Sequence, residues 1–158
     1  MDTRTPGDWR RRDAVLLVLT SVTLAVIAAQ FALAGLGAFT TIKTSAGNAY
    51  AAHMAVGIAV GALAWIILAV VLTSPAARGR AGTRWPAVAL ALLAIPVEPL
   101  LAEAGQHLPA VGALHAVTGL PIFALAGWLT GAAARQRDSA RSEQPASTSD
   151  RLARSSRP

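Results

Sequence analysis

The stretch AVLLVLTSVTLAVIAAQFALAGL, from Ala14 to Leu36, contains no charged residue. About 20 apolar residues in a helix cross a bilayer, because each residue adds about 1.5 Å across a hydrocarbon layer about 30 Å thick. The stretch is therefore predicted to be a transmembrane helix. Three more stretches share this character, at residues 49–72, 85–102 and 108–134. The fold class predicted is all-α, an integral membrane up-down bundle of four helices joined by short connections.

The spans divide the chain into three parts. Residues 1–13 form a basic tail, residues 14–134 form the transmembrane domain, and residues 135–158 are rich in Ser, Arg and Pro. The last part is predicted to be a disordered tail, because it has too little apolar surface to offset the entropy of ordering. Cleavage of the first span as a signal peptide is disfavoured, because its apolar run exceeds the usual length of about 7 to 15 residues.

The composition excludes several classes of protein. Apolar residues make up 54% of the chain and charged residues 14%, which is too apolar for an ordinary soluble domain. The chain has no cysteine, so disulfides, thiolate metal sites, covalently attached c-type haem and cysteine nucleophiles are excluded. No phosphate-binding loop, nucleophile triad or paired-carboxylate motif occurs, and whether the protein is an enzyme is left open.

The positive charges indicate how the chain is oriented. Only Lys43 lies in the connection between the first two spans, and all thirteen arginines fall on the other side of the membrane. The positive-inside rule therefore predicts a multi-pass protein of the plasma (bacterial inner) membrane, with both termini in the cytoplasm. The arginines are interpreted as orientation signals that contact anionic lipid heads, and nucleic acid is not expected as a partner. The excess of Arg over Lys and the abundant Ala suggest a GC-rich bacterial genome.

Polar residues within the spans are expensive in lipid and are candidates for function. Helical rise places Gln30 about 9 Å from the outer end of its span, His53 about 6 Å, Glu98 about 9 Å and His115 about 10 Å. Each predicted helix contributes one of the four residues. The sequence therefore predicts a polar layer at one depth, in the outer third of the membrane.

The two histidines lie in matching local sequences. YAAHMAVGI begins at Tyr50 and GALHAVTGL begins at Gly112, and both contain Ala-x-His-x-x-x-Gly. The match suggests a tandem repeat of two helical hairpins. In an up-down bundle the second and fourth spans are diagonal, so His53 and His115 could hold a haem b between them. Gly57 and Gly119 lie one turn beyond the histidines, where they could leave room for the macrocycle.

Other interpretations of these residues stay open. The glycines also suit close packing of helices through small residues. The histidines could bind a non-haem metal, or they could be neutral imidazoles hydrogen-bonded across helices to Glu98 or Thr118. Pro96 and Pro99 are expected to interrupt the helical hydrogen bonds around Glu98. That carboxyl group could donate to a haem propionate or pass protons, or it could extend from a kinked helix end to the surface.

The membrane portion resembles an uncharacterised family of small four-span bacterial membrane proteins. The resemblance rests on QFALAGLGAF at residues 30–39, HMAVG at residues 53–57 and LHAVTGLPIFALA at residues 114–126. The plan of four spans, with a histidine near the outer end of the second and fourth, also resembles one four-helix half of haem A synthase. This second resemblance implies a bis-histidine haem bundle. It does not imply the oxygenase chemistry, because Met54 follows His53 and no Glu precedes it in the loop.

The leading functional hypothesis is electron transfer by one haem b. Axial ligation by both histidines leaves no open iron position and favours one-electron chemistry. Lys43 is the only cation on the outer side and is expected to meet the propionates. A quinone or another membrane redox partner would exchange electrons with the site, and a homodimer would restore an eight-helix arrangement. The alternatives are a non-enzymatic accessory or assembly subunit of a membrane complex and a small proton-coupled transporter.

Overall fold

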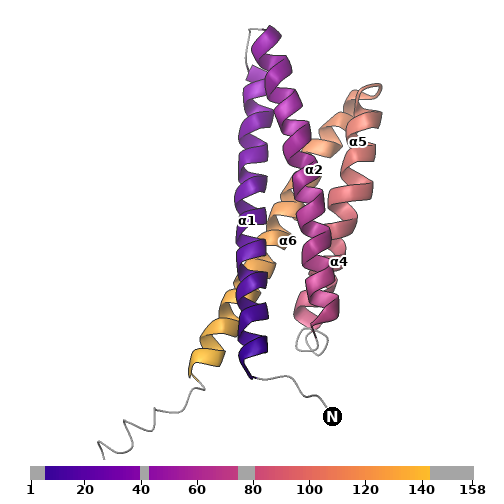
Figure 1. Cartoon of the computed structure of the whole chain (residues 1–158). Coiled ribbons are helices and arrows are strands. Elements are labelled where there is room, and N and C mark those ends of the chain that lie inside the picture. The colour runs from indigo at the N-terminus through magenta and orange to yellow at the C-terminus, as the bar shows by residue number, and fades with distance from the viewer. Residues whose placement is uncertain (1–5, 40–42, 75–80, 143–158) are drawn as a thin grey trace, which may run out of the picture.

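The computed structural model describes residues 6–39, 43–74 and 81–142, and within these ranges every long segment is helical. The predicted all-α membrane bundle of four helices is confirmed (Figure 1). The first two spans lie within single helices, the third is built from three consecutive pieces, and the fourth is again one helix. The elements are α1 (Pro6–Phe39), α2 (Lys43–Thr73), α4 (Ala81–Leu92), the π-helix η1 (Leu93–Val97), α5 (Glu98–Gly105) and α6 (Pro109–Ser142).

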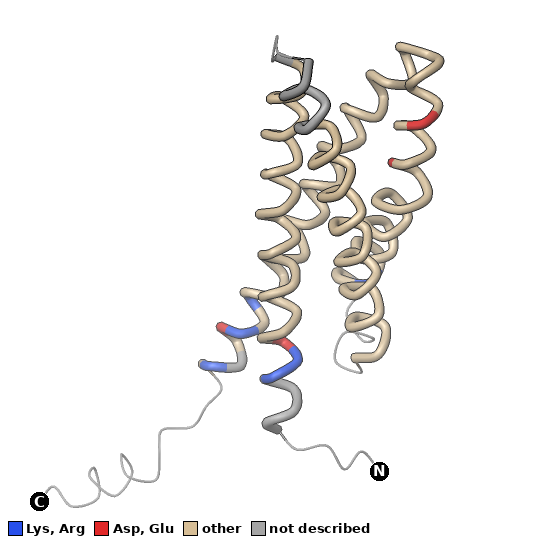
Figure 2. The backbone as a smooth tube through the Cα atoms, turned by 45° about the horizontal axis from the view of Figure 1, so that its top comes forward, with Lys and Arg blue, Asp and Glu red and all other residues tan. Residues whose placement is uncertain are grey.

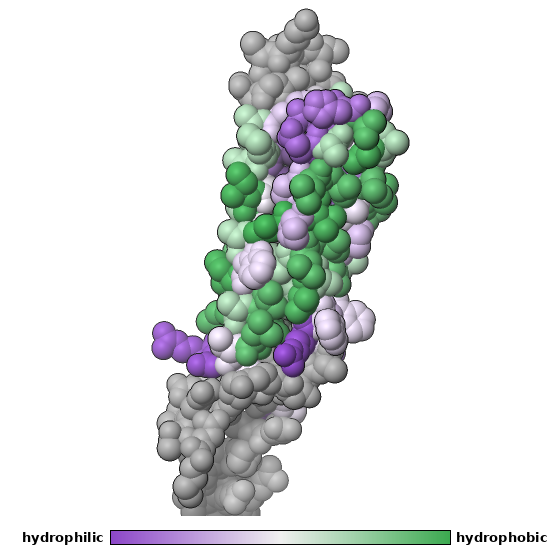
Figure 3. All heavy atoms as spheres, turned by 90° about the vertical axis from the view of Figure 1, so that its right-hand side faces the viewer, coloured by the Kyte–Doolittle hydropathy of each residue, from purple (hydrophilic) through white to green (hydrophobic). Residues whose placement is uncertain are grey.

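Four stretches of these helices are long and apolar enough to cross a membrane: Arg11–Ala38, Tyr50–Thr73, Gly82–Gly105 and Pro109–Ser139. Large apolar side chains such as Ile58 cover the outside of the bundle, as expected for a surface that faces lipid. Figure 3 shows this apolar surface on one face, between hydrophilic residues at its two ends. The chain is therefore a multi-pass membrane protein.

The helices are arranged as a four-cornered bundle. Helix α1 packs against α2 and α6, and α4 packs against the same two helices, so α2 and α6 occupy opposite corners. The start of α1 and the end of α6 lie at one end of the bundle, and the Lys and Arg positions coloured on the backbone lie toward that end (Figure 2). We call this the arginine end and the opposite end the far end. The predicted diagonal relation of the second and fourth spans is therefore present.

The tightly packed core lies toward the arginine end. On α1 it occupies one helical face, where Leu16 and Ile27 flank two threonines whose hydroxyl groups donate to carbonyl groups of the same helix. The core ends, toward the far end, at the level of four residues, one from each span. These residues are Ile27, Val60, Ala94 and Ile122.

The third span departs from a regular α-helix just before Glu98. Pro96 has no N–H group to donate, so the helix cannot keep its regular hydrogen bonds there. The chain instead forms the π-helical turn η1, and the Glu98 backbone N–H donates to the carbonyl oxygen of Leu93. A π turn holds an extra residue and rotates whatever follows it. Glu98, the first residue of α5, is oriented by this turn.

Helices α5 and α6 form a tight hairpin at the far end. Leu108 N–H donates to the Ala104 carbonyl oxygen at 3.0 Å and so closes the turn. The two backbones come close at Gly105 and Gly112, because a Cβ on Gly105 would lie 2.7 Å from the Gly112 Cα. Only residues without a side chain allow this approach.

The prediction that residues 135–158 are a disordered tail is wrong for its first part. Helix α6 continues to Ser142, and residues 143–158 lie outside the described part of the chain. Residues 135–142 are polar, but five of the eight are Arg, Gln or Ala, which favour helix in water. The Ser139 hydroxyl adds a hydrogen bond to the Arg135 carbonyl oxygen at 3.0 Å. Similarly, α1 begins at Pro6, within the predicted tail of residues 1–13.

Candidate functional site

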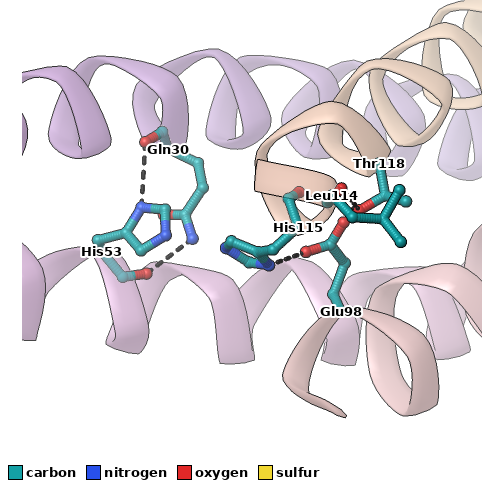
Figure 4. Close-up of polar contacts among 6 residues, drawn as sticks. All are labelled: Gln30, His53, Glu98, Leu114, His115 and Thr118. Atoms are coloured by element: carbon teal, nitrogen blue, oxygen red, sulfur yellow. Dashed lines mark hydrogen bonds and ion pairs between the residues drawn. The ribbon is translucent and has the colours of Figure 1, made fainter. Parts of the chain in front are cut away.

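The four polar residues singled out within the spans come together in one row. Gln30 comes from α1, His53 from α2, His115 from α6 and Glu98 from the start of α5. Figure 4 shows Gln30 beside His53 and Glu98 beside His115, with the end of the Gln30 side chain drawn between the two imidazoles. The row lies just beyond the end of the tightly packed core. We call these four residues the polar row.

Gln30 and His53 bind each other through two hydrogen bonds. The Gln30 side-chain amide Nε2 donates to the His53 carbonyl oxygen at 2.7 Å, and His53 Nδ1 lies 3.2 Å from the Gln30 carbonyl oxygen. A carbonyl oxygen can only accept, so Nδ1 must carry the proton of this imidazole. The Nε2 atom of a neutral His53 is therefore the one with a free lone pair.

His115 is held in the same way by a carboxyl group. Its Nδ1 contacts Glu98 Oε2 as an ion pair, and the two side chains are 30% and 14% exposed. When His115 is neutral and its Nδ1 carries the proton on the carboxylate side, Nε2 keeps the lone pair, which is the arrangement found behind metal-bound histidines. Thr118 does not take part, because its hydroxyl donates to the carbonyl oxygens of Leu114 and His115. Glu98 does not extend to the surface.

The two imidazoles face each other across the bundle. Their ring centres are 6.2 Å apart and the ring planes are at 84°. Two imidazoles on opposite sides of one iron would have ring centres about 6 Å apart, since each iron–nitrogen bond is about 2 Å and each ring centre lies about 1 Å further away. The separation of the rings fits such a site. It also fits direct edge-to-face contact between two rings.

The glycines that follow the histidines face side chains of α1. A Cβ on Gly57 would lie 2.9 Å from Gln30 Nε2, and one on Gly119 would lie 3.0 Å from the Phe31 ring. The Phe31 ring in turn makes an edge-to-face contact with Phe123, with ring centres 6.2 Å apart. The space beside both glycines is thus filled by the ends of two side chains, and a macrocycle would have to displace them.

Two acceptor atoms of the polar row remain without a partner. Gln30 Oε1 and Glu98 Oε1 are buried and make no hydrogen bond with any residue that the structure describes. A buried acceptor without a donor costs about 1 to 3 kcal/mol, so the row is a place where a donor-bearing group would be stabilised. Within residues 6–39, 43–74 and 81–142, no three His, Cys, Asp or Glu side chains form a metal-binding group.

Lys43, predicted to meet the propionates, lies outside the residues whose side chains are described. Sequence reasoning missed Phe31 and the backbone carbonyl groups of Gln30 and His53 as parts of the site. The signal for Phe31 was available, because a glycine on one helix requires a side chain from a neighbouring helix to fill its space. Nothing in the sequence indicates which backbone carbonyl an imidazole will reach.

The family model of the UNC-50 family matches residues 1–86, which is more than half of the chain. The chain therefore belongs to the UNC-50 family. The matched region includes α1 and α2, with Gln30 and His53, but not Glu98 or His115. No curated protein and no solved structure matches the chain.

This match corrects the resemblance drawn from the sequence. UNC-50 is a eukaryotic Golgi membrane family, so assignment to a bacterial family similar to haem A synthase is wrong. The motifs behind that assignment consist mainly of Ala, Gly and Leu, which recur in packed membrane helices of many families.

Proposed function

We propose that the protein binds one haem b iron between Nε2 of His53 and Nε2 of His115 and acts as a one-electron carrier in its membrane. The observation behind the proposal is that Nδ1 of His53 lies against a backbone carbonyl oxygen and Nδ1 of His115 against the Glu98 carboxylate, while the ring centres are 6.2 Å apart. The proposal rests on this side-chain geometry and not on the family match.

The number of ligands favours haem over a bare metal ion. Two imidazoles are too few for a structural zinc site, which needs four protein ligands. A haem iron already has four equatorial nitrogens, so two histidines complete its coordination and leave no position for oxygen. Gln30 and Glu98 would then act as positioning residues, because they hold the histidine rings through Nδ1. A membrane quinone or a redox protein would supply or receive the electron.

The orientation of the bundle in the membrane is inferred from the distribution of its positive charges. We infer that the arginine end faces the cytoplasm, because cytoplasmic loops carry the excess of Lys and Arg. The polar row is then in the half of the membrane away from the cytoplasm. Glycosylation-site or cysteine-labelling scans at residues 2 and 150 would test this, and modification of either end from the non-cytoplasmic side would contradict it.

Absorption spectroscopy tests the haem proposal. Protein purified from cells supplied with haem should show a low-spin b-type spectrum, which His53→Ala and His115→Ala should each abolish. His107→Ala is the matched control, because His107 lies exposed in the turn between α5 and α6 and should leave the spectrum unchanged. A wild-type protein that folds but takes up no haem would refute the proposal.

The second candidate is a non-enzymatic membrane protein in which the polar row only aligns the helices. The packing of Gln30 against Gly57 and of Phe31 against Gly119 favours it, because it fills the space that a macrocycle needs. This function predicts that His53→Ala and His115→Ala lower thermal stability and the recovery of bound partners while no cofactor is lost. Stability and absorbance, measured on the same samples, separate the two functions.

A further inference from the structure

A pocket lies between α1 and α2 at the arginine end, far from the polar row. Its volume is about 300 Å³, close to the lower limit of small-molecule pockets. Five residues line it: Arg11, Arg12, Val15, Val70 and Thr73.

The polar groups of the pocket favour a ligand with negative charge. Arg12 Nη1 donates to the Thr73 carbonyl oxygen at 3.5 Å, a contact between this guanidinium group and the end of α2. The Thr73 hydroxyl already donates within its own helix, to the Ala69 carbonyl oxygen at 2.8 Å. The remaining donors are N–H groups of the two arginines, and a guanidinium group pairs best with phosphate or carboxylate oxygens.

The apolar wall of the pocket and its depth in the membrane indicate an amphiphilic ligand. The membrane-spanning part of α1 begins at Arg11 and that of α2 ends at Thr73, so both polar residues lie at the edge of the apolar layer. Val15 and Val70 lie about one turn further into the membrane. A ligand in this pocket therefore meets cations at the level of the lipid headgroups and aliphatic side chains at the level of the acyl chains.

We propose that this pocket is a binding site for one anionic glycerophospholipid. The phosphate binds the guanidinium groups of Arg11 and Arg12, and the first part of an acyl chain lies against Val15 and Val70. Such a lipid would bridge the start of α1 and the end of α2. This site is independent of the proposed haem site, because the two lie at opposite ends of the bundle.

The test measures lipid binding by the full-length protein in a neutral detergent, by native mass spectrometry and by thermal stability. Phosphatidylglycerol should bind saturably at one site and raise Tm. Phosphatidylcholine with the same acyl chains and glycerol 3-phosphate should each bind at least about tenfold more weakly, because each lacks either the net charge or the apolar chain. Equal binding of phosphatidylcholine, or of glycerol 3-phosphate, would overturn the proposal.

Variants distinguish lipid binding in this pocket from a general attraction of anionic lipid to the arginines. The double change Arg11→Gln and Arg12→Gln should weaken phosphatidylglycerol binding about tenfold or more, and Val70→Trp should weaken it by filling the apolar wall. The control is Arg137→Gln, a change at an exposed arginine near the end of α6; this variant should bind the lipid as the wild type does. An equal loss in the control, or no loss in the double variant, would overturn the proposal.

Discussion

The two halves of the bundle differ in how their interior is filled. Toward the arginine end, fully buried apolar side chains such as Ile67, Leu90 and Leu129 pack from three different helices. Toward the far end, beyond Ile27 and Ala94, the interior holds polar groups that contact one another in pairs, and two of their acceptor atoms have no partner among the described residues. In lipid, helices associate through packing and hydrogen bonds rather than through the hydrophobic effect. The packed half is thus expected to contribute most of the stability, and the polar half is the better candidate for function.

The largest loss of stability is expected from substitutions in the packed half of the bundle. Leu90→Ala and Leu129→Ala should each destabilise the bundle by about 2 to 4 kcal/mol, because both side chains are fully buried and would leave cavities. Leu100→Ala is the control on the lipid-facing surface, where the cost should stay below about 1 kcal/mol. Unfolding in mixed detergent micelles measures the difference, and equal losses at all three positions would contradict the packed core.

Removing the carboxyl group of Glu98 should have the next largest effect. Glu98→Leu leaves buried His115 Nδ1 without its partner and should cost about 1 to 3 kcal/mol. Glu98→Gln keeps an acceptor and should cost less. If the protein binds haem, Glu98→Leu should also weaken haem binding about 10- to 100-fold, as expected for a group that orients a ligand. A Glu98→Leu protein as stable as Glu98→Gln would show that the contact with His115 has no energetic role.

A smaller effect is expected at Gln30. Gln30→Leu removes the hydrogen bond to the His53 carbonyl oxygen, and interhelical hydrogen bonds in membranes contribute about 0.6 to 2 kcal/mol. Exposed Gln106 is the control, and Gln106→Leu should change stability by less than about 0.5 kcal/mol. Thermal unfolding followed by circular dichroism makes the comparison. Identical unfolding of the two variants would mean that Gln30 does not hold α1 to α2.

The smallest effect concerns the glycine beside Gln30. Gly57→Ala should cost up to about 1 kcal/mol, because its Cβ would lie 2.9 Å from Gln30 Nε2 and would push that amide away from His53. Gly127→Ala is the matched control, since nothing lies within 4 Å of its Cβ, and helix propensity should make it neutral or stabilising. The sign of the difference in Tm between the two variants is the result to check.

The features that could be predicted from the sequence are those that depend only on a residue's position along the chain. Spans follow from runs of apolar residues, and the common depth of Gln30, His53, Glu98 and His115 follows from counting residues. Contacts depend on rotation about each helix axis, which a count does not supply. The bond between Gln30 and the His53 carbonyl oxygen could not be predicted for this reason. The helical end of α6 was missed because a polar segment need not be disordered.

The tight α5–α6 hairpin bears on how the protein enters the membrane. The third span carries Glu98 and three prolines, which raise the cost of inserting it alone. Its connection to α6 is short, and the contact between Glu98 and His115 lies within this hairpin. Two helices that leave the ribosome in succession can thus pair the carboxyl group with the imidazole before either reaches lipid. The hairpin is expected to insert as one unit, so a stop codon placed between α5 and α6 should leave the third span outside the bilayer.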